Sequence, residues 1–343
     1  MFLLRLLIIT LVITALSSAG VYFFYSKSLD QNLALPNEGL VLEIKKGETL
    51  NSVLYGLKEQ GVFEKLWPAK IYARLNAFGS QIKAGEFKLS SPMTVPQLLQ
   101  FISSNNQISY LIQFIEGSSY QDALLILARN EKILHRLTGL SDDEIAKKLD
   151  LEYSTHLEGQ FYPDTYHFHK GDSDLDILKR AKQRLKTILE DEWQNRQKDL
   201  PLESSYQALI LASIIEKETG VPEERPEIAG VFTRRLQMKM RLQTDPTVIY
   251  GLGDSYKGNI TRKHLKQVTP YNTYRISGLP PTPIALVGRA AINAALNPKL
   301  GKTIFFVAKG DGSHYFSETI GEHNKAVRKF QLKRRSDYRS SAQ

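Results

Sequence analysis

The chain has 343 residues, of which 42% are hydrophobic and 24% charged, so it is long enough for two globular domains plus attachments. Its net charge of +9 suits anionic lipid headgroups, an acidic polymer or nucleic acid, and does not choose among them. The sequence contains no cysteine, which excludes a disulfide framework and thiolate metal sites and is compatible with an oxidising compartment.

Residues 6–25 form a run of 20 residues without a charge, long enough for a helix across a membrane. Arg5 and the amino terminus precede the run and Lys27 follows it, which favours a single-pass anchor with its N-terminus in the cytoplasm. The alternative is a cleaved signal peptide, with Ser17 and Ala19 as the small residues before the cut. We favour a retained anchor over residues 1–27, because the apolar run continues past that point.

A polar linker is predicted at 28–39, followed by a compact unit at 40–106. The unit is predicted to contain a strand at 40–44, a helix capped by Thr49, a second helix near 67–76, a strand at 85–89 and a helix capped by Thr94. This β-α-α-β order resembles a LysM module, a fold similar to those that bind N-acetylglucosamine polymers. The alternative is a small packing or spacer domain.

The next segment reads as a strand at 108–115, a helix at 120–129 and an amphipathic helix at 177–193. Between them, residues 158–166 (EGQFYPDTY) combine turn formers and aromatic rings with acids, a composition that suits a sugar-binding surface and equally a packed corner. His167 and His169 lack a third ligand at a telling spacing, so we interpret them as structural histidines rather than a metal site.

Residues 206–220 (YQALILASIIEKETG) are apolar on all sides and therefore predict a helix buried in a core. Gly220 suits a C′ cap, so the helix should end near Thr219, with Glu216 and Glu218 in its last turn. The helix dipole and an apolar pocket both disfavour a carboxylate there and raise its pKa, which suits a general acid. Glu218 stacks over isoleucines and is predicted to be the more desolvated acid. The alternative is that both acids mark where the helix reaches water.

A helix at 226–240 leads into residues 241–251 (RLQTDPTVIYG). If this segment is extended, Arg241, Gln243 and Asp245 share one side, and Asp245 caps a short helix that starts at Pro246. The proline-rich segment 278–283 suits a groove wall, a helix follows at 288–296, and a hairpin follows over 303–317. There is no Walker A sequence and no Gly-x-Ser-x-Gly elbow, and we predict neither a metal nor a cofactor.

Several strings together resemble the endolytic murein transglycosylase family, also called YceG-like. They are SIIEKET (213–219), RLQTDPTVIYG (241–251), YNTY (271–274), GLPP (278–281) and EGQFYPDTY (158–166), in order along nearly the whole chain. The resemblance implies an α+β protein with an inner-membrane anchor, a LysM-like domain and a periplasmic catalytic domain distantly similar to lysozyme-like folds. We assign that catalytic domain to 107–335 and a polar tail to 336–343.

The resemblance also implies cleavage within peptidoglycan glycan strands that leaves 1,6-anhydro-N-acetylmuramic acid ends. The family's catalytic glutamate falls on Glu218. We predict that substrate is bound by residues of the two loops that follow, and that Glu216 and Thr244 support the site indirectly. The predicted substrate-binding residues are Gln243, Asp245, Tyr250, Tyr271 and Asn272.

Three other functions stay open at this stage: a hydrolytic muramidase using Glu218 with Asp245 and water, a non-enzymatic peptidoglycan-binding scaffold, and a membrane-tethered nucleic-acid binder that rests only on net charge. We predict no nucleic-acid partner. An internal cutter would fix strand length, so synthases of the penicillin-binding class are the expected protein partners.

Overall fold

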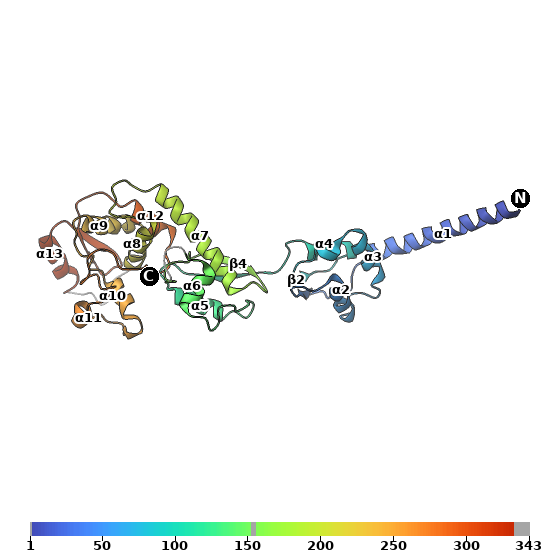
Figure 1. Ribbon diagram of the computed structural model, residues 1–343, viewed down its shortest axis with the longest axis horizontal. Coiled ribbons are helices and arrows are strands. Elements are labelled where there is room, and N and C mark those ends of the chain that lie inside the picture. Colours follow the sequence, from blue (N-terminus) through green and yellow to red (C-terminus); the bar gives the residue numbers. More distant parts are fainter. Residues whose placement is uncertain (1, 152–155, 333–343) are drawn as a thin grey trace. The chain divides into compact units, whose positions relative to one another are not determined.

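The computed structural model describes residues 2–151 and 156–332 of a mixed α+β protein with small two-stranded sheets (Figure 1). The chain divides into two compact units. The N-terminal unit comprises residues 1–110, 132–134 and 167–172, and the C-terminal unit comprises 111–131, 135–166 and 173–343. The predicted tail at 336–343 lies outside the described residues.

The N-terminal helix α1 (Phe2–Asp30) is long and apolar enough to cross a membrane. Its side chains are exposed along most of its length, with large apolar residues facing outward. A water-soluble surface helix carries a polar stripe, so an exposed and uniformly apolar helix is consistent with a lipid environment.

The rest of the N-terminal unit has the predicted element order. It contains β1 (Leu40–Ile44), α2 (Leu50–Glu59), α3 (Trp67–Leu75), a 3-10 turn η1 (Phe78–Ser80), β2 (Gly85–Leu89) and α4 (Val95–Ser103). β1 and β2 pair antiparallel, with Leu42 opposite Phe87. Thr49 and Thr94 cap α2 and α4 as predicted.

The segment expected to be a polar linker, 28–39, contributes to the core of this unit. Leu33 and Leu35 are buried in that core. Removing these apolar side chains from water lowers the free energy of the folded chain, although the rest of the stretch is polar. The Leu33 amide donates to the Met93 carbonyl at 2.8 Å, and Asn32 forms a bridge with Thr94. The end of α1 is therefore fixed directly to the small domain.

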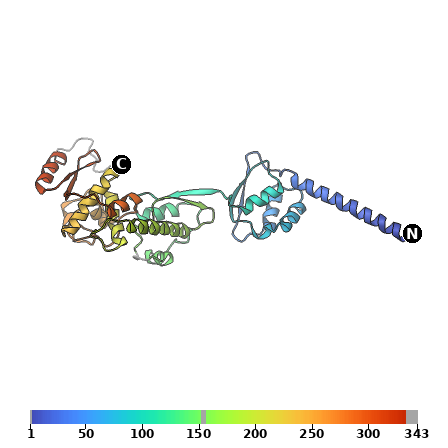
Figure 2. The same cartoon turned by 90° about the horizontal axis from the view of Figure 1, so that it is seen from above.

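The C-terminal unit is built around α8 (Ser205–Glu218), whose apolar residues are buried on all sides, as the sequence predicts. Helices α7 (Asp174–Gln194), α9 (Arg225–Gln237), α10 (Asp245–Leu252) and α12 (Arg289–Leu296) pack against it. Figure 2 shows α7 as the long yellow-green helix of this unit. The remaining elements are α5 (Tyr120–Ala128), α6 (Asp142–Leu149), η2 (Pro222–Glu224), η3 (Gly253–Ser255), α11 (Arg262–Lys266), β5 (Phe305–Ala308), β6 (His314–Ser317) and α13 (Ile320–Phe330).

A further two-stranded sheet pairs β3 (Ser109–Gln113) with β4 (Thr165–His169). The imidazole Nδ1 atoms of His167 and His169 lie 3.0 Å from the Ser109 hydroxyl and 3.1 Å from the Ile108 carbonyl oxygen. Both histidines thus hold β3 and β4 together, which fits their interpretation as structural residues.

Candidate active site

The end of α8 is set by its sequence. The Ser204 hydroxyl accepts from the Gln207 amide at the start of the helix, and Glu218 is its last residue. Thr219 ends the helix in an extended conformation, with φ at −143°. Gly220 does not adopt a positive φ, so the expected glycine cap is not formed. The buried Thr219 ends the helix instead.

Glu218 is partly exposed, and its carboxyl group faces the start of α10. The Thr244 hydroxyl donates a short hydrogen bond to its Oε1. The pKa of Glu218 is raised to about 7, because burial and the nearby Asp245 charge outweigh the lowering effects of Thr244 and Arg235. This carboxyl group can therefore both give and take a proton near neutral pH.

A hydroxyl network fixes Thr244 in front of Glu218. The Thr244 amide donates to the Thr273 hydroxyl at 3.0 Å, and the Thr247 hydroxyl donates to the Thr244 carbonyl at 2.8 Å. Arg235, which is buried, donates to the Leu242 carbonyl at 2.6 Å and to the Ile304 carbonyl at 2.7 Å. The support that Thr244 gives to Glu218 is thus itself held from two sides.

Gln243 and Asp245 flank Thr244 and are both exposed. Gln243 has a left-handed backbone, with φ at 52°, and its amide donates to the Thr273 carbonyl at 3.2 Å. A non-glycine residue in this conformation costs about 1 kcal/mol, and such strain gathers at functional sites. The segment is therefore not the regular strand assumed from the sequence. Thr244 occupies the N-cap position, and Asp245 is the first residue of α10.

Asp245 accepts a hydrogen bond from the Tyr274 hydroxyl at 2.7 Å. Because α10 begins at Asp245, its carboxylate also lies at the positive end of the helix dipole. The hydrogen bond holds the Asp245 side chain, whose charge acts on Glu218.

Asn272 was predicted to bind the sugar, but its side chain is bonded to the protein backbone. Its side chain is 1% exposed, and its amide nitrogen donates to the carbonyls of His264, Leu265 and Gln267. Its Oδ1 accepts from the Tyr274 amide at 3.0 Å. In this structure Asn272 shapes the loop from which Thr273 and Tyr274 reach toward α10.

Tyr250 and Tyr271 pack edge to face, with ring centroids 4.9 Å apart. The Tyr271 hydroxyl lies 2.8 Å from the Thr282 hydroxyl of the proline-rich segment. Both tyrosines are partly buried. They join α10, the loop at 269–274 and the predicted groove wall into one surface.

Glu158, the first residue of the aromatic segment 158–166, is a second carboxyl with a raised pKa and was not predicted as a site residue. It is 2% exposed and accepts from the Tyr120 amide at 3.0 Å and from the Tyr250 hydroxyl. Burial raises its pKa to about 7. Gly159 has φ at 73°, and a Cβ there would lie 2.4 Å from Pro283. The Glu-Gly pair therefore packs against the groove wall; its signal in the sequence was an acid followed by glycine among aromatic residues.

Glu216 occupies the other side of the last turn of α8. Its side chain is 4% exposed and forms an ion pair with Arg225 at 2.9 Å. The Gly288 amide donates to its second oxygen at 3.0 Å. Burial raises the pKa of Glu216, while Arg225 and the amide oppose that rise. Glu216 thus joins α8 to the starts of α9 and α12.

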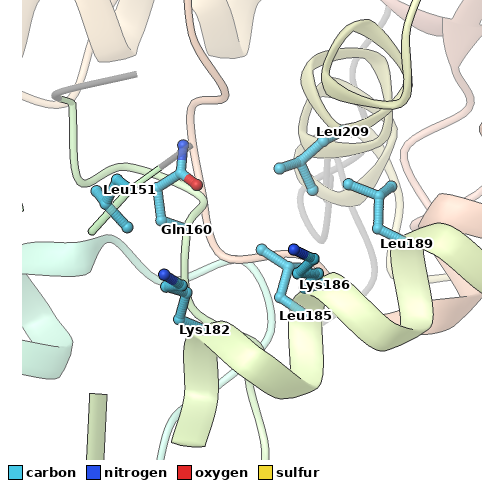
Figure 3. Close-up of a pocket in the computed structure, with 7 residues that line it drawn as sticks. All are labelled: Leu151, Gln160, Lys182, Leu185, Lys186, Leu189 and Leu209. Atoms are coloured by element: carbon cyan, nitrogen blue, oxygen red, sulfur yellow. The ribbon is translucent and has the colours of Figure 1, made fainter. Parts of the chain in front are cut away.

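An apolar pocket lies elsewhere in the unit, between α7 and the first half of α8 (Figure 3). It is lined by four leucines, two lysines and a glutamine: Leu151, Leu185, Leu189, Leu209, Lys182, Lys186 and Gln160. None of the predicted site residues lines it. Within residues 2–151 and 156–332, no group of three or more His, Asp or Glu side chains is arranged to hold a metal ion.

Comparison with known proteins places these observations in a family. The model of the YceG-like family matches residues 42–329. An endolytic murein transglycosylase of Bacillus subtilis is 30% identical over 91% of this chain and 90% of its own length. One of Streptococcus pneumoniae is 24% identical over 92% of this chain and 63% of its own length.

The crystal structure of a YceG-like protein from Listeria monocytogenes matches with a TM-score of 0.53 and 31% identity, over 84% of this chain and 99% of that one. The chain belongs to the YceG-like family.

Proposed function

We propose that this chain is an endolytic murein transglycosylase that cleaves MurNAc–GlcNAc bonds within peptidoglycan glycan strands. The observation that carries the proposal is Glu218, whose carboxyl group lies at the end of a buried helix and has a pKa raised to about 7. The names of the relatives from Bacillus subtilis and Streptococcus pneumoniae support the same activity.

One carboxyl group suffices for this chemistry. Most glycosidases use two carboxylates, because one must assist departure of the leaving group and the other must attack or activate water. In a transglycosylase the C6 hydroxyl of the N-acetylmuramic acid attacks its own C1. Protonated Glu218 gives its proton to the glycosidic oxygen, and the C1–O bond breaks. Ionised Glu218 then takes the proton of the C6 hydroxyl as the new C1–O6 bond forms. The product end is a 1,6-anhydro sugar, and Glu218 is protonated again.

The neighbouring side chains have distinct parts in this proposal. Thr244 orients Glu218 through its hydroxyl. Gln243 and Asp245, which are exposed beside it, bind the sugar and its acetamido group, and the rings of Tyr250 and Tyr271 form the wall on which a sugar rests. Asn272 contributes by building the loop rather than by direct contact, because its amide is already bonded to backbone. Holding the C6 hydroxyl close to C1 makes its attack intramolecular and disfavours attack by water.

The N-terminal part gives the proposed enzyme its place in the cell. We assign α1 as a retained single-pass anchor in the inner membrane, with its N-terminus cytoplasmic and the folded chain that follows α1 periplasmic. The β-α-α-β order of residues 40–103 supports a LysM-like domain, and the buried α8 supports a distant likeness of the catalytic domain to lysozyme-like folds. Cleavage within strands would limit nascent strand length, which makes penicillin-binding synthases the expected neighbours.

Product mass tests the proposal. Purified sacculi digested with the full chain should release fragments with anhydro ends, which are lighter by one water than hydrolysed ends. Hydrolysed ends would contradict the transglycosylase and favour a muramidase that uses Glu218 with Asp245. If no fragments are released and a Glu218→Gln chain still complements a deletion strain, the protein is a peptidoglycan-binding scaffold instead.

A further inference from the structure

Helix α3 carries an apolar stripe on its outer side. Trp67, Ile71 and Leu75 are spaced four residues apart, and their side chains are 40%, 42% and 74% exposed. Residues at this spacing lie on one face of a helix, so the three form a continuous surface, called here the α3 stripe. The small residues Ala69 and Ala73 on the opposite face pack into the core. Continuous exposed apolar surface of this kind marks an interaction site.

The α3 stripe begins where the membrane-length helix ends. The ring of Trp67 lies 6.1 Å from the ring of Tyr25, measured between centroids. Tyr25 is the last residue of the charge-free apolar run of α1. Tryptophan and tyrosine gather at the level of lipid headgroups, because their rings are apolar with one polar atom. If α1 spans the bilayer, Trp67 therefore lies at that level.

The connection between α1 and the domain leaves little room for α3 to move away from the bilayer. Helix α1 continues to Asp30, and Leu29 packs against the core of the domain. Leu33 is buried in that core and is hydrogen-bonded to Met93. No flexible spacer separates the apolar run from the folded domain over these described residues, so the surface beside α1 stays within a few residues of the membrane.

Basic side chains accompany the stripe. Lys70 and Arg74 lie on α3 beside Trp67, and Lys27 is in the last turn of α1. Lys65 just before α3 is exposed, and so is the acidic Glu64 next to it. Lys70 also donates to the Tyr55 hydroxyl at 2.9 Å. A lysine or arginine near an anionic lipid surface contributes about 1 kcal/mol of attraction.

We infer that the α3 stripe docks on the bilayer that α1 crosses, with Trp67, Ile71 and Leu75 among the lipid headgroups and the upper acyl chains. Lys70 and Arg74 then meet the phosphates of anionic phospholipids. The inference rests on the proposed anchoring by α1. It gives the N-terminal domain a second, surface attachment to the membrane in addition to the span itself.

The two tryptophans of the chain, Trp67 and Trp193, make the test direct. The full chain is reconstituted in phosphatidylethanolamine–phosphatidylglycerol vesicles that contain lipid brominated near the headgroup end of its acyl chains. Three reporters are compared: Trp67 in a Trp193→Phe chain, Trp193 in a Trp67→Phe chain, and Leu75→Trp in a chain that lacks both natural tryptophans. The bromolipid should quench the reporters at 67 and 75 several-fold more than Trp193. Quenching at 75 no stronger than that at Trp193 would overturn the docking.

A fourth reporter separates docking from anchoring. Leu16→Trp, in the chain that lacks both natural tryptophans, lies within the apolar run of α1 and should be quenched by lipid brominated deep in its acyl chains. If 16 is quenched and 75 is not, the anchor holds and only the docking is contradicted. If 16 is not quenched, both are contradicted.

A charge variant tests the part played by lipid phosphates. Lys70→Gln combined with Arg74→Gln should reduce quenching at 75 in vesicles with phosphatidylglycerol and leave it unchanged in uncharged phosphatidylcholine vesicles. Equal quenching with and without the two cations in the anionic vesicles would contradict the contact with anionic headgroups.

Discussion

The two sides of the last turn of α8 place chemically identical side chains in different surroundings. Glu216 and Glu218 are two positions apart, which is about 200° around a helix, so they face nearly opposite directions. Glu216 meets a cation and a backbone amide, from Arg225 and Gly288. Glu218 meets the hydroxyl of Thr244 and the negative charge of Asp245.

The contrast shows that burial alone does not define a proton carrier. The Glu216 side chain is 4% exposed, and burial raises its pKa, yet the guanidinium of Arg225 stabilises its ionised form. Glu218 accepts from the neutral Thr244 hydroxyl, and burial together with the nearby Asp245 charge outweighs that hydrogen bond and the charge of Arg235, so its pKa rises to about 7. The carboxyl group expected to exchange a proton near neutral pH is therefore that of Glu218, which is not on the side of the helix that faces Arg225.

The largest expected effect comes from removing each carboxylate in turn. Glu218→Gln should lower kcat on purified sacculi by about 100- to 10,000-fold, the range for loss of a general acid–base group, while the protein remains folded. The measurement is the rate of anhydro-end release, with circular dichroism to verify the fold.

Glu216→Gln is the matched control for that substitution. It makes the same chemical change in the same helix turn. It should lower kcat per folded molecule by less than about tenfold, because Glu216 supports packing and does not transfer a proton. Equal losses of kcat from the two substitutions would contradict the different roles given to Glu216 and Glu218.

Arg225→Ala removes the cation that pairs with Glu216 and that also lies 4.0 Å from Glu116, without touching Glu218 or Thr244. Removal of the cation leaves the buried Glu216 side chain with the Gly288 amide as its hydrogen-bond donor, which should cost about 3–5 kcal/mol of unfolding free energy. Urea denaturation measures the loss. Adding Glu216→Gln to Arg225→Ala should restore a large part of it, and failure of that rescue would show that the ion pair is not the source of the cost.

The pH dependence of stability tests the raised pKa of Glu218. The folded-state pKa of about 7 lies above the ordinary value of 4.5, so the folded protein binds more protons than the unfolded chain between those pH values. Stability from this group is thus present at low pH and is lost as pH rises toward 7. At pH 8, Glu218→Gln should therefore be more stable than the wild type by about 1–3 kcal/mol, with little difference at pH 4. Parallel stability curves for the two proteins would rule out the raised pKa.

The smallest expected change is at Thr244. Its hydrogen bond lowers the pKa of Glu218, so Thr244→Val should raise that pKa further and slow the step in which ionised Glu218 acts as a base. We expect a loss of about 3- to 10-fold in activity at neutral pH and of about 1 kcal/mol in stability. Thr244→Ser keeps the hydroxyl and should retain most activity; a serine variant as impaired as the valine one would assign Thr244 a packing role.

Local patterns predicted much of the fold. The strands of the N-terminal domain, the caps at Thr49 and Thr94, and the buried α8 ending at Glu218 all follow from turn residues and apolar periodicity. The hairpin of β5 and β6 lies within its predicted range. Helix α7 starts earlier than predicted, because Ser173 forms a capping box with Asp176.

The rest of the fold could not be predicted, either because the elements are short or because their residues are positioned by long-range contacts. Helix α6, strand β4 and helix α11 were not predicted, because they are short and lie in polar or turn-rich sequence. The packing of Leu33 and Leu35 depends on partners up to 60 residues away. Of the candidate site, Glu218 follows from its helix, whereas Glu158 and Arg235 are positioned by contacts with residues far away in the sequence, Tyr120 and Ile304.

The central claim is that Glu218 holds an exchangeable proton near neutral pH. Infrared spectroscopy of the full chain measures it directly, through the carbonyl band of protonated carboxyl groups followed from pH 5 to 9. We predict that the wild type loses bands with midpoints near pH 7 from Glu218 and Glu158, and that Glu218→Gln lacks one of them. Superimposable titrations of the two proteins would contradict the account.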